Sequence, residues 1–105
     1  MSNRQLPMSY AELEGIIHKR AFDSSNVTFT DHCMQRLSER EITPIEAIRC
    51  LRRGAIVGRV EYDEPRDTWK FRIQEPPPKD IVCLVAAVSL DQASREVIAI
   101  TVWEI

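Results

Sequence analysis

Residues 29–54 have the sequence FTDHCMQRLSEREITPIEAIRCLRRG, and this stretch contains the boundary between two helices. The Thr-Pro-Ile-Glu segment at residues 43–46 carries three helix-start signals: a Thr at the N-cap, a Pro at the first helical position and a Glu that completes a capping box. Apolar side chains follow at helical spacing, and Gly54 is suited to the C-cap. We therefore predict a helix over residues 44–53.

The preceding helix carries a row of polar residues. Thr30 or Asp31 is suited to cap this helix, which is expected to end near Arg40. Because residues four apart share a helix face, His32, Arg36 and Arg40 form one polar ridge. The residues expected to face the core from this helix are Cys33, Met34 and Leu37.

One imidazole beside two permanent cations is suited to a phosphodiester. Histidine moves protons near neutral pH, and arginine binds phosphate oxygens. The plain structural alternative is a solvated helix face on which Arg36 pairs with Asp31 or Glu39, since exposed ion pairs of this kind contribute little.

The periodicity outside this stretch predicts helices first and strands afterwards. Ser9 and Glu12 form a second capping box, which predicts a helix over residues 9–21. After Gly54 the apolar period changes from helical to two, which is typical of strands. Strands are expected at residues 56–62, 68–74, 81–90 and 97–103, and residues 27–29 are a short strand or an extended lead-in.

This order of elements predicts an α+β fold. We expect N-terminal helices packed on one face of a four-stranded, mainly antiparallel sheet, because the strands follow one another with short connections. The apolar segment at residues 81–90 is expected to be a central strand covered on both faces, and Trp69 is expected to lie in the core. The other face of the sheet is expected to be partly open, where a site could form.

The composition is that of one globular domain. The chain has 105 residues, of which 44% are hydrophobic, and its formal net charge is −2, so residues 1–105 are expected to form a single domain. This charge argues against a protein that coats DNA nonspecifically and leaves room only for a small basic patch.

The cysteine content indicates a reducing compartment. Three cysteines, an odd number without zinc-ligand spacing, predict neither a disulfide framework nor a metal site. Cys33, Cys50 and Cys83 lie in apolar runs, so we expect small buried hydrophobes in a cytoplasmic protein. We find no secretory signal, and the longest apolar run, residues 81–88, is too short to span a membrane.

Short motifs across residues 27–103 resemble a bacterial family, domain of unknown function 4258. The matching residues are Thr30, His32, Arg36, Arg40-Glu41-Ile42-Thr43, Gly54 and Ile100-Thr101-Val102. Residues 1–26 lie outside the resemblance and form an N-terminal helical extension. The chain departs from the family pattern at Glu41, where glycine is common.

That family is similar to the RelE/ParE-like and barnase-like small toxins, which are compact α+β domains. Many of these toxins cut RNA without a metal ion and are held inactive by a cognate antitoxin protein. The resemblance therefore implies the toxin of a bacterial toxin–antitoxin system. Its activity would be that of a cofactor-free and metal-independent endoribonuclease, and its substrates would include ribosome-associated mRNA.

Metal-free RNA cleavage needs a base for the 2′-hydroxyl, an acid for the leaving 5′-oxygen, and cations for the phosphorane-like transition state. With the resemblance, His32 becomes the candidate acid or base and Arg36 the candidate phosphate clamp. Arg40 either joins them or fastens the helix end to the sheet. The candidate RNA-binding residues are Lys70, Arg72 and Thr101. Their structural alternatives are a soluble strand face for the two cations and a good β-former for the threonine.

Two other functions remain open. A catalytically silent or ParE-like member would act by binding a protein partner, and the acidic balance, Glu41 and the lack of a second acid or base histidine within the resembling region favour it. A regulatory RNA- or DNA-binding subunit is disfavoured because no strongly basic surface is indicated. The sequence carries no signal for the oligomeric state.

Overall fold

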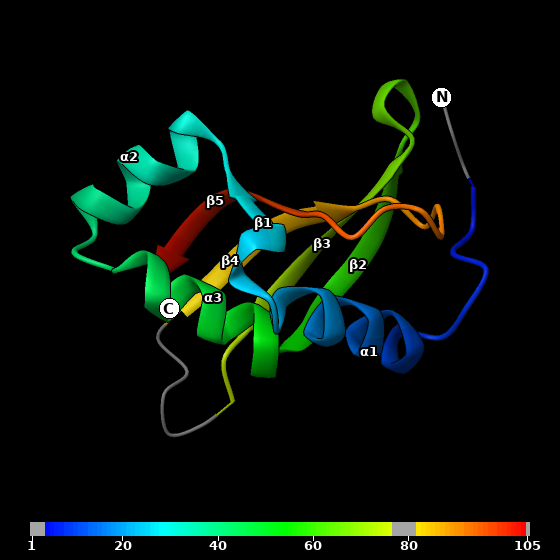
Figure 1. Cartoon of the computed structure of the whole chain (residues 1–105), viewed down its shortest axis with the longest axis horizontal. Helices are drawn as coiled ribbons and strands as arrows, with labels where there is room; N and C mark the ends of the chain where they lie inside the picture. Colours follow the sequence, from blue (N-terminus) through cyan, green and yellow to red (C-terminus); the bar gives the residue numbers. More distant parts are fainter. Residues whose placement is uncertain (1–3, 77–81, 105) are drawn as a thin grey trace.

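The computed structural model describes residues 4–76 and 82–104, which form helices followed by a sheet (Figure 1). The α-helices are α1 (Tyr10–Ala21), α2 (Asp31–Glu39) and α3 (Pro44–Arg53). The strands are β1 (Val27–Phe29), β2 (Ala55–Asp63), β3 (Thr68–Gln74), β4 (Val82–Val88) and β5 (Val97–Glu104). Two short 3-10 turns, η1 (Ser24–Asn26) and η2 (Glu64–Arg66), precede β1 and β3. The fold is therefore α+β, as the order of the sequence patterns predicted.

The sheet has one strand more than predicted and is mixed. Its strand order is β1-β5-β4-β3-β2, in which β2 to β5 form the expected antiparallel meander. Strand β1 pairs in parallel with β5, with Val27 opposite Val97. The prediction of four strands is thus wrong. A three-residue strand is too short to show alternation, and its pairing joins segments far apart in the chain.

The helix boundaries agree with the predicted start signals. Capping boxes are present at Ser9 for α1 and at Thr43 for α3. At the start of α2, the Thr30 hydroxyl accepts a hydrogen bond from the Cys33 amide and donates one to the Ile100 carbonyl, both at 3.0 Å. The cap of α2 is thereby tied to β5, against which this helix packs.

Helices α1 and α3 lie across one face of the sheet, and α2 packs against β5 (Figure 1). The core between these layers is filled by apolar side chains from both, among them Leu13, Ile17, Leu51, Phe71 and Leu84. Strand β4 is buried along nearly its whole length on both faces, which confirms the predicted central strand, although the strand ends at Val88 rather than at residue 90. We call the sheet face opposite α1 and α3 the open face.

Most predicted core residues are buried. Cys33 and Leu37 of α2 are buried, as is Trp69, and all three cysteines are buried and free. Met34 is the exception, because its side chain remains 44% exposed. The apolar contact surface of α2 is a narrow stripe against β5, and Met34 lies about 100° around the helix from Cys33, beyond the edge of that stripe.

Gly54 ends α3 as predicted, although for a different reason. Its φ of −76° is not left-handed, so the usual conformational argument for a C-terminal glycine does not apply. A Cβ at this position would lie 2.6 Å from the Cys50 carbonyl oxygen and 2.7 Å from that of Gln74. Glycine is needed here because the end of α3 touches the backbone of β3.

Candidate functional site

The open face carries the cations predicted on β3. Lys70 and Arg72 are exposed there, while Phe71 and Ile73 alternate with them and are buried in the core. Paired residues on adjacent antiparallel strands share a face, so the strand register locates their neighbours. Lys70 lies opposite the small Ala87 on β4, which leaves space above the sheet.

The same register places the third predicted strand residue on this face. Val85 of β4 pairs with Arg72 on one side and with Thr101 of β5 on the other. Arg72 and Thr101 therefore flank Val85 in a single row across the sheet. The three predicted RNA-binding residues thus share the open face, in two neighbouring rows.

A cleft of about 290 Å³ is present on the open face, and we call it the open-face cleft. Ala87, Ile98 and Ile100 provide its apolar surface. Its polar side chains are Thr30, Asp63, Arg66, Thr68 and Lys70. The cleft therefore brings the cap residue of α2 together with β3, two segments that are far apart in the sequence.

The charges around the cleft are only partly neutralised. Arg66 donates a hydrogen bond to Asp63 at 3.2 Å, so these two form an ion pair at one end. Within the described part of the chain, Lys70 makes no ion pair, although Glu61 is its register partner on β2. Lys70 is thus an exposed cation available to an anionic ligand.

Thr68 adds an unsatisfied polar atom to this cleft. The residue is 8% exposed, and its Oγ1 is buried without a hydrogen-bond partner among the described residues. A buried hydroxyl left unpaired costs about 1–3 kcal/mol. Such a group in the lining of a cleft marks a position where a ligand could supply the missing partner.

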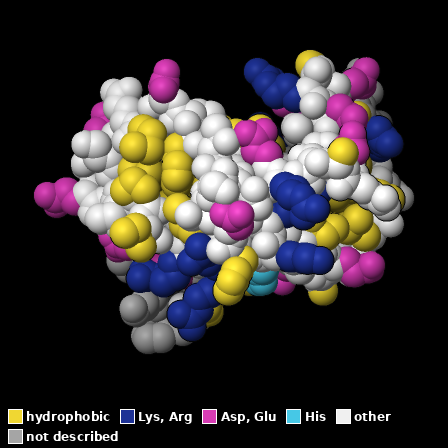
Figure 2. All heavy atoms as spheres, viewed as in Figure 1, with side chains coloured by type: hydrophobic (Ala, Val, Ile, Leu, Met, Phe, Trp, Pro, Cys, Tyr) yellow, Lys and Arg dark blue, Asp and Glu magenta, His cyan; other side chains and the backbone are white. Residues whose placement is uncertain are grey.

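The ridge residues predicted on α2 do not line the cleft, although its lining includes the cap residue of this helix, Thr30. His32 is exposed in the first turn of the helix, whereas Arg36 and Arg40 are half-buried. Arg36 lies 3.7 Å from Glu39, which is one of the ion pairs proposed as the plain alternative, and its Nε is buried without a hydrogen-bond partner among the described residues. Over α2, the helix-covered side of the molecule shows hydrophobic and acidic side chains but no Lys, Arg or His (Figure 2).

The second histidine of the chain has a structural role. His18 on α1 lies with its Nε2 2.7 Å from the Gly54 carbonyl oxygen. A carbonyl only accepts, so Nε2 carries the proton and donates. This bond ties α1 to the end of α3 and leaves His32 as the histidine whose ring makes no hydrogen bond within the described residues.

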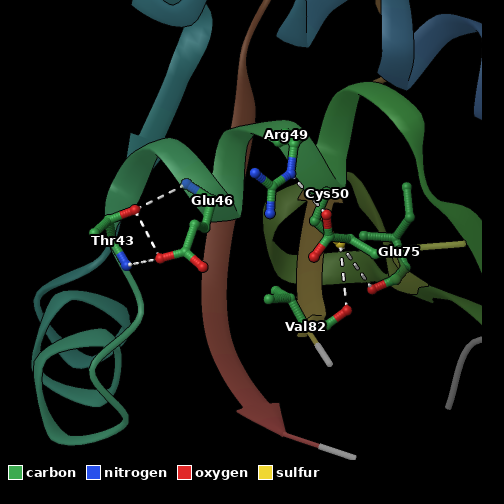
Figure 3. A network of polar contacts seen from close by, with 7 residues as sticks. Thr43, Glu46, Arg49, Cys50, Glu75 and Val82 are labelled. Atoms are coloured by element: carbon green, nitrogen blue, oxygen red, sulfur yellow. Dashed lines mark hydrogen bonds and ion pairs between the residues drawn. The ribbon is translucent and has the colours of Figure 1, made fainter. Parts of the chain in front are cut away.

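Sequence reasoning missed a buried ionic contact at the end of β3 (Figure 3). Arg49 of α3 donates a hydrogen bond to Glu75 at 2.8 Å, and Glu75 is only 4% exposed. Nearby, the Cys50 thiol faces the Ile73 and Val82 carbonyls, and burial followed by the charge of Glu75 raises the pKa of this thiol. Glu75 directly precedes a proline run, which resembles an exposed loop, so no local signal predicted its burial. We interpret the Arg49–Glu75 ion pair as a contact that holds α3 against the sheet.

The remaining basic residues of α3 also have structural partners. Arg52 donates hydrogen bonds to the carbonyls of Ala21 and Phe22, both at 2.8 Å. These bonds fasten α3 to the end of α1. Arg52 also lies in the last turn of α3, where a cation complements the helix dipole.

The chain matches no protein-family model, and no curated protein and no solved structure is significantly similar to it. Within residues 4–76 and 82–104, every helix is too short or too polar to cross a lipid bilayer. The same residues hold no group of three His, Cys, Asp or Glu side chains arranged to bind a metal ion.

Proposed function

We propose that the open-face cleft binds the RNA backbone and that the neighbouring ridge of α2 cleaves it without a metal ion. The observation that carries this proposal is the convergence in one cleft of Lys70, which has no ion-pair partner among the described residues, and the unsatisfied hydroxyl of Thr68. Thr30, which also lines the cleft, caps the helix that begins with Asp31 and His32. The cleft volume of about 290 Å³ is at the lower end for small-ligand sites and is suited to one nucleotide of a longer strand.

The proposed chemistry is transesterification followed by product release. His32 takes the proton of a 2′-hydroxyl, whose oxygen attacks the adjacent phosphorus and forms a 2′,3′-cyclic phosphate. The bond to the 5′-oxygen breaks, and that oxygen leaves with a proton returned by an acid or by water. Arg36 and Lys70 stabilise the additional negative charge that develops on the phosphate group in the transition state. Arg40, the third residue of the ridge, adds positive charge next to Arg36.

Arg72 and Thr101 bind the next unit of the strand in this proposal. They lie in the row of the sheet adjacent to Lys70, so a strand crossing the open face would pass from one row to the other. An arginine suits a phosphate because its guanidinium donates two parallel hydrogen bonds. The threonine hydroxyl donates or accepts one more.

The biological role proposed with this activity is that of a toxin held by a cognate antitoxin in the bacterial cytoplasm. One structural detail supports the resemblance on which this role rests. Glu41 has a φ of 56°, a left-handed conformation that favours glycine, and glycine is the residue common there in the family that the sequence resembles. The backbone at position 41 therefore has a conformation that glycine adopts readily, although the side chain here is that of glutamate.

A second candidate function is a catalytically silent or ParE-like protein that acts by binding a protein partner. The ion pairs Arg36–Glu39 and Asp63–Arg66 favour it, because each neutralises a cation that RNA would otherwise meet. These pairs are both partly exposed, so a phosphate could still compete with the carboxylates.

The test is cleavage of a labelled RNA by the purified chain in the presence of a chelator. We expect products with 2′,3′-cyclic phosphate ends from RNA and none from a 2′-O-methyl RNA of the same sequence, because the attacking hydroxyl is then blocked. His32→Ala should reduce the rate at least 100-fold, since general acid–base catalysis contributes about 10²–10⁴-fold.

Matched variants locate the site. Lys70→Gln should weaken RNA binding, whereas Arg59→Gln, which removes an exposed cation from β2 outside the cleft lining, should leave it unchanged. Cleavage that persists in His32→Ala would reject the proposed mechanism. Folded wild-type protein that neither binds nor cuts RNA would instead favour the protein-binding alternative.

A further inference from the structure

A second and larger hollow lies on the helix-covered side, between α1, η1 and the connection from β4 to β5. Its volume is about 640 Å³, and we call it the basic hollow. Lys19 and Arg20 enter it from the last turn of α1, and Arg95 enters it from the connection. Lys and Arg side chains gather on this part of the surface, where the connection passes close to α1 (Figures 1 and 2). None of these residues belongs to the open-face cleft.

The hollow has more positive than negative charge. Three cations and one carboxylate, Asp23, line it, which leaves a balance of +2. The Asp23 carboxylate is already engaged, because it accepts hydrogen bonds from the Ser25 amide at 3.0 Å and the Ser25 hydroxyl at 2.7 Å. Among the described residues, no ion pair neutralises Lys19, Arg20 or Arg95.

Arg20 is held in a fixed position inside this charged region. It donates a hydrogen bond to the Ser89 carbonyl at 2.7 Å and a longer one to the Glu96 carbonyl at 3.4 Å. Both bonds come from Nη1, so the other guanidinium nitrogens remain for a ligand. Burial lowers the pKa of Arg20, and the nearby charge of Arg95 lowers it further. The guanidinium groups of Arg20 and Arg95 are thus within electrostatic range of each other.

We propose that the basic hollow binds a phosphate monoester of mononucleotide size. A phosphate monoester carries a charge of about −1.5 to −2 at pH 7, which matches the +2 balance of the lining. Arginine forks bind phosphate oxygens in pairs, and an anion between Arg20 and Arg95 removes their mutual repulsion. The volume lies within the usual range for small-molecule sites and exceeds what a bare phosphate needs. Ile16 and Leu90 provide apolar surface for the organic part of such a ligand.

The test is calorimetric titration of the full chain at constant ionic strength with adenosine 5′-monophosphate, inorganic phosphate and adenosine. We expect the monophosphate to bind more tightly than inorganic phosphate and adenosine not to bind. Arg95 is an exposed residue of the connection from β4 to β5, so Arg95→Gln should leave the fold intact. This variant should lower the affinity for the monophosphate at least tenfold. Lys70→Gln, which removes a cation from the open-face cleft, should leave this affinity unchanged, so failure here is distinct from failure of the RNA-cleavage proposal.

Several outcomes would overturn the inference. Equal affinity in wild type and Arg95→Gln, or a loss in Lys70→Gln alone, would place the anion elsewhere. Adenosine binding as tightly as its monophosphate would remove the role of the phosphate, and inorganic phosphate binding equally well would reject a mononucleotide-sized ligand. An RNA 5′ end carries the same phosphate chemistry, so a 5′-phosphorylated dinucleotide is titrated in parallel. Weaker binding of the dinucleotide than of adenosine 5′-monophosphate supports a small ligand. Tighter binding of the dinucleotide overturns the inference in favour of an RNA 5′ end.

Discussion

Replacing each glycine by alanine tests at which positions this fold requires a residue without a side chain. At Gly54, the new Cβ would lie within 2.6–2.8 Å of Cys50, Gln74 and Ile73, and two of the three contacts are backbone carbonyl oxygens. Backbone atoms cannot move aside by changing rotamer, so α3 and β3 must separate by several tenths of an ångström. Overpacking of this kind costs about 1–3 kcal/mol, and we expect the upper end, about 3 kcal/mol, for Gly54→Ala.

The two other glycines, Gly15 and Gly58, provide matched comparisons because, apart from their chain neighbours and the backbone of their own helix, no described atom lies within 4 Å of the position of an added Cβ. Gly58 has a φ of 73°, so Gly58→Ala should lose about 1 kcal/mol through backbone strain alone. Gly15 lies exposed within α1, and Gly15→Ala should stabilise the chain by about 0.5–1 kcal/mol through helix propensity.

Urea denaturation at 25 °C, followed by far-ultraviolet circular dichroism, gives the free energy of unfolding of all three variants. The expected order of stability is Gly15→Ala, wild type, Gly58→Ala and then Gly54→Ala, with unchanged denaturant dependence. A loss in Gly54→Ala no larger than that in Gly58→Ala would refute the close-approach explanation, because the clash would then be relieved without cost.

Four further predictions concern caps, strain, thiols and buried charge. In urea denaturation, Thr30→Ala should lower the free energy of unfolding by about 1–2 kcal/mol, whereas Thr30→Ser should keep most of the wild-type stability because it keeps the hydroxyl. Equal losses in the two variants would mean that the hydroxyl is not the cap. Glu41→Gly should gain about 0.5–1 kcal/mol in the same assay by relieving a left-handed backbone, and a loss would show that the Glu41 side chain contributes more than the strain. Burial raises the pKa of the Cys33 thiol to about 11 and also raises those of Cys50 and Cys83, so thiol labelling at pH 8 should be slow until urea unfolds the chain; rapid labelling of folded protein would contradict this burial. Arg49→Met should lower the melting temperature more than the double variant Arg49→Met/Glu75→Gln, because the single change leaves a buried carboxylate unpaired; a double variant less stable than the single one would be inconsistent with that reasoning.

The helices could be predicted closely because their signals are local. The capping boxes at Ser9 and Thr43 and the cap at Thr30 depend on residues within three positions, and the start of each helix follows from them. Strands β2 and β3 and the buried strand β4 were also predictable from period and composition over short windows. Hydrophobic periodicity reports which face of an element is buried, and this face is the same in any compact arrangement of those elements.

The candidate site could be predicted only in part. The alternation of β3 determined that Lys70 and Arg72 would lie on an exposed face, and the four-residue spacing determined that His32 and Arg36 would share a side of α2. Neither pattern reports which strands are neighbours. The row of Arg72, Val85 and Thr101 and the meeting of Thr30 with Lys70 follow from strand register.

Local sequence patterns were sufficient to predict the three helices, the four strands of the meander, their order and the α+β class. Three features depend on the folded arrangement: the parallel pairing of β1 with β5, the burial of Glu75 against Arg49, and the basic hollow between α1 and the β4–β5 connection. The physical reason is the range of the interactions. Caps, periodicity and turn chemistry act within a few residues, whereas strand pairing, ion pairing and cavity shape depend on segments that meet only when the chain is folded.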